Sequence, residues 1–406
     1  MTKPERQTAR VGPRPLAMHL AIAAASCAIS NVALPLLKNA SPTWKPELRD
    51  QAAALARAID AAAPDAFAAA ADREARARLD RFLTGVERYR RHPYRRNLED
   101  PAPIWSDGNA RLLRFGEAGP ALLLVASLVN RSYILDLGPR RSFVRWLAAR
   151  GVRCYLLDWR SPRARERAFT LDDYICGPLE AAFDAARADS GGPVSVLGYC
   201  MGGLLALALA LRRPAETANL LLLATPWDFH AGDARQARDF GTAMRLFEPQ
   251  LALLGELPTD MLQYLFCTLD PLLGLRKFSN FAGLDPASAA AARFVALEDW
   301  LNDGVPLAAP VARACAFEWY EENRPARGAW RVRGIPVRAE AWDRPAYVVI
   351  PAADRIVPPP SAEALAAALP DTTVRRPRAG HIGMMVGRGV TRSIWAPLAE
   401  WLHAHS

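Results

Sequence analysis

The stretch VSVLGYCMGGLLALALAL, from Val194 to Leu211, decides the fold of this chain of 406 residues. It opens with apolar and β-branched residues typical of a buried strand and closes with a Leu/Ala run typical of a helix. Between them lies the glycine-rich turn GYCMGG, residues 198–203, with Cys200 at its centre. A sharp strand-to-helix turn of this kind lifts its central side chain above the sheet, where a nucleophile is needed. The turn therefore predicts that Cys200 is a nucleophile.

Strands and helices alternate on both sides of this turn. The predicted strands cover residues 111–115, 121–127, 152–158, 194–197, 219–225 and 347–351 and the neighbourhood of Val374. The predicted helices cover residues 142–150, 171–188, 201–213, 361–369 and 391–404, with a break in the second at Gly177-Pro178. Apolar strands that alternate with helices predict an α/β fold with a mostly parallel sheet and helices on both faces.

The same pattern divides the chain into three parts. Residues 1–100 form an N-terminal helical extension, and residues 101–226 and 338–406 form the α/β core. Residues 227–337 are rich in Leu, Phe, Trp and Pro and interrupt the alternation. Because they follow the strand at 219–225, taken as the sixth, we predict a helical cap inserted above the strand ends, where the chemistry lies.

The N-terminal segment from Leu16 to Leu37 is apolar, but polar residues recur along it. This favours an amphipathic or surface-associating helix. A weak signal peptide and a marginal membrane span are the alternatives.

Composition bounds the choice of partners. The net charge is +9 and the pI about 9.5, yet no Lys/Arg run carries interleaved aromatic residues, so no nucleic acid is expected. The scattered arginines reflect either a compositional bias or a surface for anionic partners such as CoA phosphates. Six cysteines without CxxC pairs indicate a reducing cytosol, and no metal or other cofactor is predicted.

A nucleophile at such a turn needs a base, and the base needs an orienting carboxylate. Asp354 follows the strand YVVIP, and His381 follows later in RAGHIGMMVG. The same order of nucleophile, acid and histidine along the chain is found in α/β-hydrolases. The segment GYCMGG also resembles the strand-to-helix turn of those enzymes. The backbone N–H of Met201 and that of Val129, in SLVNR, are the predicted oxyanion-hole donors.

Sulfur in place of oxygen favours one type of reaction. A nearby histidine and a helix N-terminus favour the thiolate. Attack by a thiolate on an acyl-CoA exchanges one thioester for another, so the acyl group stays activated and can pass on to a hydroxyl. Cys200 therefore favours acyl transfer over hydrolysis.

Nine motifs in the same order make the chain similar to polyhydroxyalkanoate (PHA) synthases, and most of all to the short class III catalytic subunits. They run from about residue 92 to 387 and are HPYRRNLEDP, LVNRSYILDLGP, LLDWRSP, LDDY at Leu171, LGYCMGG, LLATPWDF, LEDWLNDGVP, IPAADRIVPP and GHIGMMVG. The resemblance implies an α/β-hydrolase fold, with Cys200 as nucleophile, His381 as base and Asp354 as its aspartate. It also implies a 3-hydroxyacyl-CoA substrate, a growing polyester chain as product, and a cytoplasmic enzyme associated with PHA granules.

The chain departs from the family pattern at Arg355, where the family often has histidine, and at Ala126-Ser127, where it tends to carry an aromatic residue or prolines. Two other functions compete: a cysteine hydrolase such as a dienelactone-hydrolase-like enzyme or thioesterase, and a non-catalytic granule-associated protein. Whether the chain forms a homodimer, and whether it needs a second synthase subunit, stays open.

Overall fold

A computed structural model describes residues 10–38, 44 and 46–406. The chain forms two compact units. Unit 1 comprises the residues up to Arg95 together with 263–302, and unit 2 comprises 96–262 and 303–406. The predicted cap is thus divided, because residues 263–302 group with the N-terminal helices and the remainder of 227–337 groups with the sheet.

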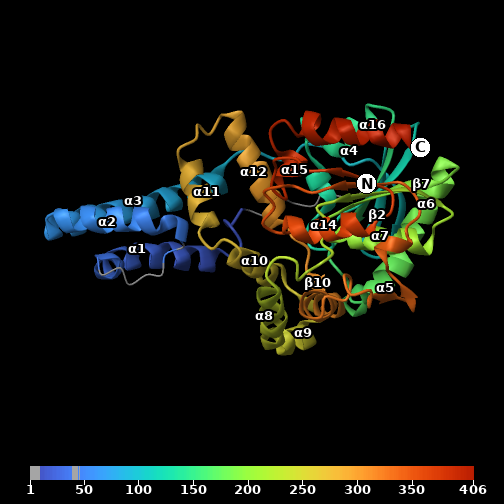
Figure 1. Cartoon of the computed structure of the whole chain (residues 1–406). Coiled ribbons are helices and arrows are strands. Elements are labelled where there is room, and N and C mark those ends of the chain that lie inside the picture. Colours follow the sequence, from blue (N-terminus) through green and yellow to red (C-terminus); the bar gives the residue numbers. More distant parts are fainter. Residues whose placement is uncertain (1–9, 39–43, 45) are drawn as a thin grey trace. The chain divides into compact units, whose positions relative to one another are not determined.

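Unit 1 is helical. Its helices are α1 (Leu16–Lys38), α2 (Arg49–Ala61), α3 (Pro64–Arg91), α11 (Leu273–Ala282) and α12 (Ala289–Asn302), and α10 (Thr259–Thr268) crosses the boundary between the units. Figure 1 shows α2 and α3 as a pair of consecutive helices. Phe82 and Tyr89 of α3 meet the ring of Phe278 edge-on, with centroids 6.2 and 5.7 Å apart. Gly85 lets α11 approach, because a Cβ there would overlap the carbonyl of Phe278.

The apolar N-terminal segment forms the single helix α1. His19 and Ala23 are buried within unit 1. No helix of the described residues is both long and apolar enough to cross a membrane. Association of α1 with a surface stays a prediction.

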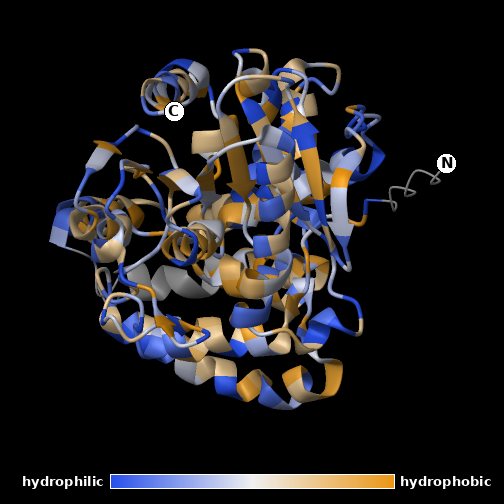
Figure 2. Ribbon diagram, turned by 90° about the vertical axis from the view of Figure 1, so that its right-hand side faces the viewer, coloured by the Kyte–Doolittle hydropathy of each residue, from blue (hydrophilic) through white to orange (hydrophobic). Residues whose placement is uncertain are grey.

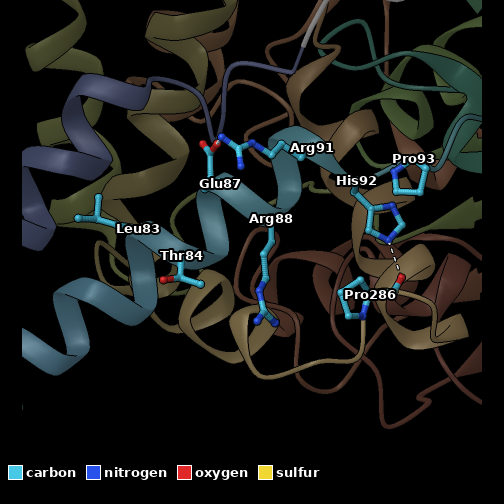
Figure 3. Close-up of a pocket in the computed structure, with 8 residues that line it drawn as sticks. All are labelled: Leu83, Thr84, Glu87, Arg88, Arg91, His92, Pro93 and Pro286. Carbon is cyan, nitrogen blue, oxygen red and sulfur yellow. Dashed lines mark hydrogen bonds and ion pairs between the residues drawn. The ribbon is translucent and has the colours of Figure 1, made fainter.

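Unit 1 also contains a pocket of about 480 Å³ (Figure 3). Its lining includes Arg88, Arg91 and His92, and the ring of His92 hydrogen-bonds the carbonyl of Pro286 across 2.9 Å. None of the predicted catalytic residues lines it.

Unit 2 is built on an eight-stranded sheet of order β1-β2-β6-β3-β7-β8-β13-β14. Its strands are β1 (Pro103–Asp107), β2 (Ala110–Phe115), β3 (Ala121–Val125), β6 (Arg153–Trp159), β7 (Val194–Tyr199), β8 (Thr217–Leu223), β13 (Ala346–Val349) and β14 (Thr372–Arg375). Neighbours from β6 to β14 are parallel, while β1, β2 and β6 pair antiparallel. As predicted, β8 is the sixth strand of this sheet in chain order.

Burial explains the apolar character of the central strands. All residues of β3 and β7 are buried, and Figure 2 draws strands of the sheet mainly in the hydrophobic colour. Figure 1 shows α4 and α16 on one side of the sheet and α7 and α14 on the other. Strands covered on both faces need continuous apolar runs rather than alternation.

The helices of unit 2 are α4 (Phe143–Ala148), α5 (Leu171–Tyr174), α6 (Glu180–Ser190), α7 (Met201–Arg212), α8 (Ala234–Met244), α9 (Glu248–Leu254), α13 (Ala309–Arg313), α14 (Pro359–Ala368), α15 (Gly383–Val386) and α16 (Ala396–Ala404). Three two-stranded pairs accompany them: β4 (Asp136–Gly138) with β5 (Arg141–Ser142), β9 (Glu256–Leu257) with β10 (Leu307–Ala308), and β11 (Arg331–Val332) with β12 (Ile335–Pro336).

Two local predictions were wrong. The helix at 171–188 does not break at Pro178, because a π-helical segment, Ile175–Leu179, joins α5 to α6. The wider hydrogen-bond spacing of a π-turn accommodates a residue without an N–H. The predicted strands do not include β1, whose side chains are mostly exposed, so its sequence lacks an apolar strand pattern.

Gly202→Ala is expected to destabilise the protein by about 3 kcal/mol, the upper end of the usual cost of overpacking. A Cβ on Gly202 would overlap the carbonyl oxygen of Val125, which is backbone and cannot move aside. Gly192→Ala is the matched control, since a Cβ there meets nothing within 4 Å. Urea unfolding of both variants measures the effect, and equal stabilities would contradict this account of the turn.

Candidate active site

Cys200 stands at the junction of β7 and α7 in a strained conformation. Its φ of 56° and ψ of −129° lie in a region that residues with a Cβ rarely adopt. Its N–H donates to the carbonyl of Leu223 across 2.9 Å, and its own carbonyl accepts from Gly203 across 2.9 Å. The side chain is partly exposed. This is the geometry of a nucleophile elbow, and its glycines let α7 start close to the sheet.

Asp354 and His381 lie on loops that follow β13 and β14. The Nδ1 atom of His381 is 2.7 Å from Oδ2 of Asp354, and both side chains are buried. Oδ1 of Asp354 accepts hydrogen bonds from the backbone N–H groups of Ile356 and Val357, at 2.8 and 2.9 Å. Two amides thus fix the carboxylate, and the carboxylate fixes the imidazole.

The imidazole of His381 also interacts electrostatically with the side chain of Cys200. Its ring stacks on that of Tyr199, with centroids 5.3 Å apart, and the Tyr199 hydroxyl donates to the His381 carbonyl across 3.0 Å. The structure therefore brings the three predicted residues Cys200, His381 and Asp354 together at one site.

Electrostatics favour the imidazolium form of His381. Burial alone would lower its pKa, but negative charge at Cys200 and hydrogen bonds with Asp354 and Cys200 outweigh burial and raise the pKa to about 10. The ordinary value is 6.5, so the ring holds its proton through neutral pH. A thiolate–imidazolium pair is the form in which a cysteine attacks.

An NMR titration of the His381 ring should give a midpoint far above 6.5 in the wild type and a lower one in Cys200→Ala. Below its pKa the ring is an imidazolium, and above it the ring is neutral. The alanine variant removes the charge and hydrogen bond of Cys200 but keeps the burial, so deprotonation moves to lower pH. The same midpoint in both proteins would contradict the coupling.

The two predicted oxyanion donors are placed differently. Met201 is the first residue of α7, so its N–H has no partner within the helix. The N–H of Val129 donates to the hydroxyl of Ser127 across 3.2 Å. That hydroxyl has to turn away before the Val129 amide can bind an oxyanion.

Sequence reasoning missed two further side chains near Cys200. Cys315 and Tyr320 lie on a π-helical segment, Ala314–Glu321. Burial and negative charge, including that at Cys200, raise the pKa of both groups. The rings of Phe229 and Phe240 contact Tyr320 at centroid distances of 4.9 and 4.7 Å. The one signal in the sequence was the aromatic density of the segment, which does not specify a position.

Among the described residues, no group of three or more His, Cys, Asp or Glu side chains is arranged to hold a metal ion.

The fold and the elbow define an α/β-hydrolase-fold protein. A family model described as the alpha/beta hydrolase fold matches residues 120–388. A solved structure, the monoacylglycerol lipase of Paleococcus ferrophilus, is 17% identical with a TM-score of 0.49 and covers 73% of this chain and 99% of its own. The match of the family model to residues 120–388 confirms the predicted fold class.

Curated relatives narrow the family. The poly(3-hydroxyalkanoate) polymerase subunit PhaC of Allochromatium vinosum is 30% identical over 294 residues, 71% of this chain and 82% of the relative. That of Haloferax mediterranei is 28% identical over 318 residues, 75% of this chain and 63% of the relative. The chain belongs to the poly(3-hydroxyalkanoate) polymerase family, as its motifs indicated. It spans 61–63% of the length of two curated relatives.

Proposed function

We propose that this protein is a polyhydroxyalkanoate synthase that polymerises 3-hydroxyacyl-CoA and releases CoA. The observation that carries the proposal is the arrangement of Cys200, His381 and Asp354 at the elbow, with sulfur as the nucleophile. Membership in a family whose curated relatives are named poly(3-hydroxyalkanoate) polymerase supports the substrate class. The reaction is acyl transfer through a covalent acyl-cysteine.

The first half-reaction loads the enzyme. The Cys200 thiolate attacks the thioester carbonyl of the substrate, and the Met201 N–H, with the Val129 N–H once it is released, stabilises the oxyanion. The C–S bond to CoA breaks, and the CoA sulfur leaves as a thiol after it takes the proton of His381. The product is an acyl-Cys200 thioester and free CoA.

The second half-reaction forms the ester. His381 is now neutral and takes the proton of a hydroxyl group from another hydroxyacyl unit. The alkoxide attacks the acyl-Cys200 carbonyl, an ester bond forms, and the thiolate of Cys200 leaves and is regenerated. Because the group passed on was a thioester, ester formation runs downhill. Asp354 stabilises the imidazolium in both half-reactions.

We further propose that the parts of 227–337 that belong to unit 2 form the cap over this site. The proximity of Cys315 and Tyr320 to the charge at Cys200 supports this. A cytoplasmic location on PHA granules follows from the proposed polyester product. No cofactor takes part in the proposed reaction.

One assay separates the competing functions. Purified protein is incubated with 3-hydroxybutyryl-CoA while CoA release and insoluble polymer are followed together. Release of CoA with polymer supports the synthase. Release of CoA without polymer indicates a cysteine hydrolase. The absence of both CoA release and polymer favours a non-catalytic granule protein.

A further inference from the structure

The loop that joins β3 to the short 3₁₀ helix Ser132–Leu135 is held at both ends by neighbouring residues of β6. At its start, the indole N–H of Trp159 donates to the carbonyl of Ala126 across 3.2 Å. At its end, the hydroxyl of Ser132 donates to Oδ1 of Asp158 across 2.6 Å. Both contacts are buried, so the ends of the loop are fixed to the sheet.

The middle of the loop is held by backbone contacts with a second segment of unit 2, at residues 304 and 305. The N–H of Val305 donates to the carbonyl of Val129 across 2.9 Å. Asn130 and Gly304 form an isolated antiparallel bridge. Residues 304 and 305 come from the end of the insertion, so the loop is held at three points by two different parts of unit 2.

Asp158 is itself rigid. It is opposite Arg111 in the antiparallel pairing of β2 and β6. The Nε of Arg111 donates to Oδ2 of Asp158 across 2.8 Å, and the carboxylate is almost completely buried. The contact that anchors Ser132 is therefore part of a buried charge pair.

Within this fixed loop, one side chain lacks a partner. The Nδ2 atom of Asn130 is buried and has no hydrogen-bond partner in the described part of the chain. A buried donor without an acceptor destabilises a fold, and native proteins rarely leave one. Because the backbone of Asn130 is paired with Gly304, the residue cannot shift to find an acceptor. A ligand that brings an acceptor would resolve the deficit.

The loop lies at the same edge of the sheet as the nucleophile. β3 and β7 are parallel neighbours, with Val125 opposite Gly198 in the register. The loop after Val125 and the elbow after Gly198 therefore leave the sheet side by side. The close approach of Gly202 to Val125 and Ala126 ties the two segments together.

We propose that Asn130 is a further catalytic residue and that its side-chain amide donates a hydrogen bond to the acyl carbonyl oxygen of the substrate. The inference rests on the proposed acyl transfer, in which that oxygen gains negative charge when Cys200 attacks. A donor held in place before the reaction stabilises such charge without reorganisation. Asn130 thereby acts alongside the Met201 amide, while the Val129 amide is bonded to Ser127.

The test is the rate of acylation in Asn130→Ala, measured by rapid quench and intact-protein mass spectrometry with 3-hydroxybutyryl-CoA. We expect this rate to fall by about 10²- to 10³-fold, the usual effect of removing one oxyanion donor. The melting temperature should stay equal or rise, because an unpaired buried donor is removed. Asn130→Asp keeps the shape of the side chain but replaces the donor with an acceptor. Its rate of acylation should fall at least as far as that of Asn130→Ala.

Asn109→Ala is the matched control. Asn109 is a buried asparagine of the same unit, but its Nδ2 donates to the carbonyl of Arg160 across 2.8 Å. Its replacement should lower the melting temperature and leave acylation within a few fold of wild type. The two substitutions are therefore expected to differ in both measurements. Asn130→Ala should slow acylation without lowering the melting temperature, whereas Asn109→Ala should lower the melting temperature without slowing acylation appreciably.

Two results would overturn the inference alone: acylation of Asn130→Ala within threefold of a functional wild type, or a melting temperature that falls as in Asn109→Ala while Asn130→Asp acylates normally. A wild type that forms no acyl adduct and releases no CoA overturns the proposed function as well. The wild-type trace thus distinguishes the two failures.

Discussion

Cys200→Ala is expected to abolish CoA release from 3-hydroxybutyryl-CoA, with a loss of about 10⁴-fold or more, because the reaction then lacks its nucleophile. The rate of CoA release by Cys200→Ser should fall by roughly 10³-fold. The serine hydroxyl is much less acidic than a thiol, and an oxoester retains less free energy for the next ester bond. Both variants keep a small side chain at a strained position, so the fold should survive.

Intact-protein mass spectrometry after a substrate pulse measures the intermediate directly. The wild type should gain the mass of a hydroxyacyl group, and digestion should place it on the peptide that contains Cys200. An adduct that persists at the wild-type level in Cys200→Ala would falsify the proposed nucleophile. Near-normal polymer formation by Cys200→Ser would contradict the argument from thioester energy.

The second large effect concerns Asp354→Asn. We expect acylation to slow by about tenfold or less and polymer growth by roughly 10²-fold or more, within the usual range for general-base loss. The backbone amides of Ile356 and Val357 already bind Oδ1. In the asparagine variant they retain the carbonyl oxygen, which turns the NH₂ group towards His381 Nδ1.

That contact would oblige Nδ1 to accept and leave the proton on Nε2, the tautomer that cannot act as a base. A thiol ionises readily even beside a weakened base, whereas a hydroxyl needs a well-oriented one. His381→Gln is the comparison, since it should damage both steps. Rapid-quench acylation beside steady-state CoA release separates the steps, and an equal loss in Asp354→Asn would leave Asp354 only an orienting role.

The sequence predicted what local patterns determine. The strands around the elbow are continuous apolar runs, so the position of Cys200 followed from the run Val194–Tyr199 and its glycines. Asp354 and His381 were found because parallel strands deliver their following loops to one edge of a sheet. The pattern also placed the predicted cap after β8, but it did not show that this segment is divided between the two units.

What depends on distant contacts was not predictable. The aromatic residues of 263–302 are as apolar as the rest of the insertion, so composition could not show that Phe278 and Phe281 pack with α3. Likewise, the loop around Asn130 is held by a backbone bridge to Gly304, which lies far away in the chain. Pro178 predicted a break because a sequence does not reveal a switch to π-helical hydrogen bonding.

Unit 1 is assembled from two pieces of chain that are far apart in sequence, and this constrains how the protein can be shortened. A truncated chain that begins at Arg96 would keep α11 and α12 but lose the helix against which Phe278 is buried. It would also leave the Asp299 carboxylate without its Arg10 partner, 2.6 Å away. An excised N-terminal fragment would expose Phe82 and Tyr89 in turn. The two pieces behave as one module, to be exchanged or deleted only together.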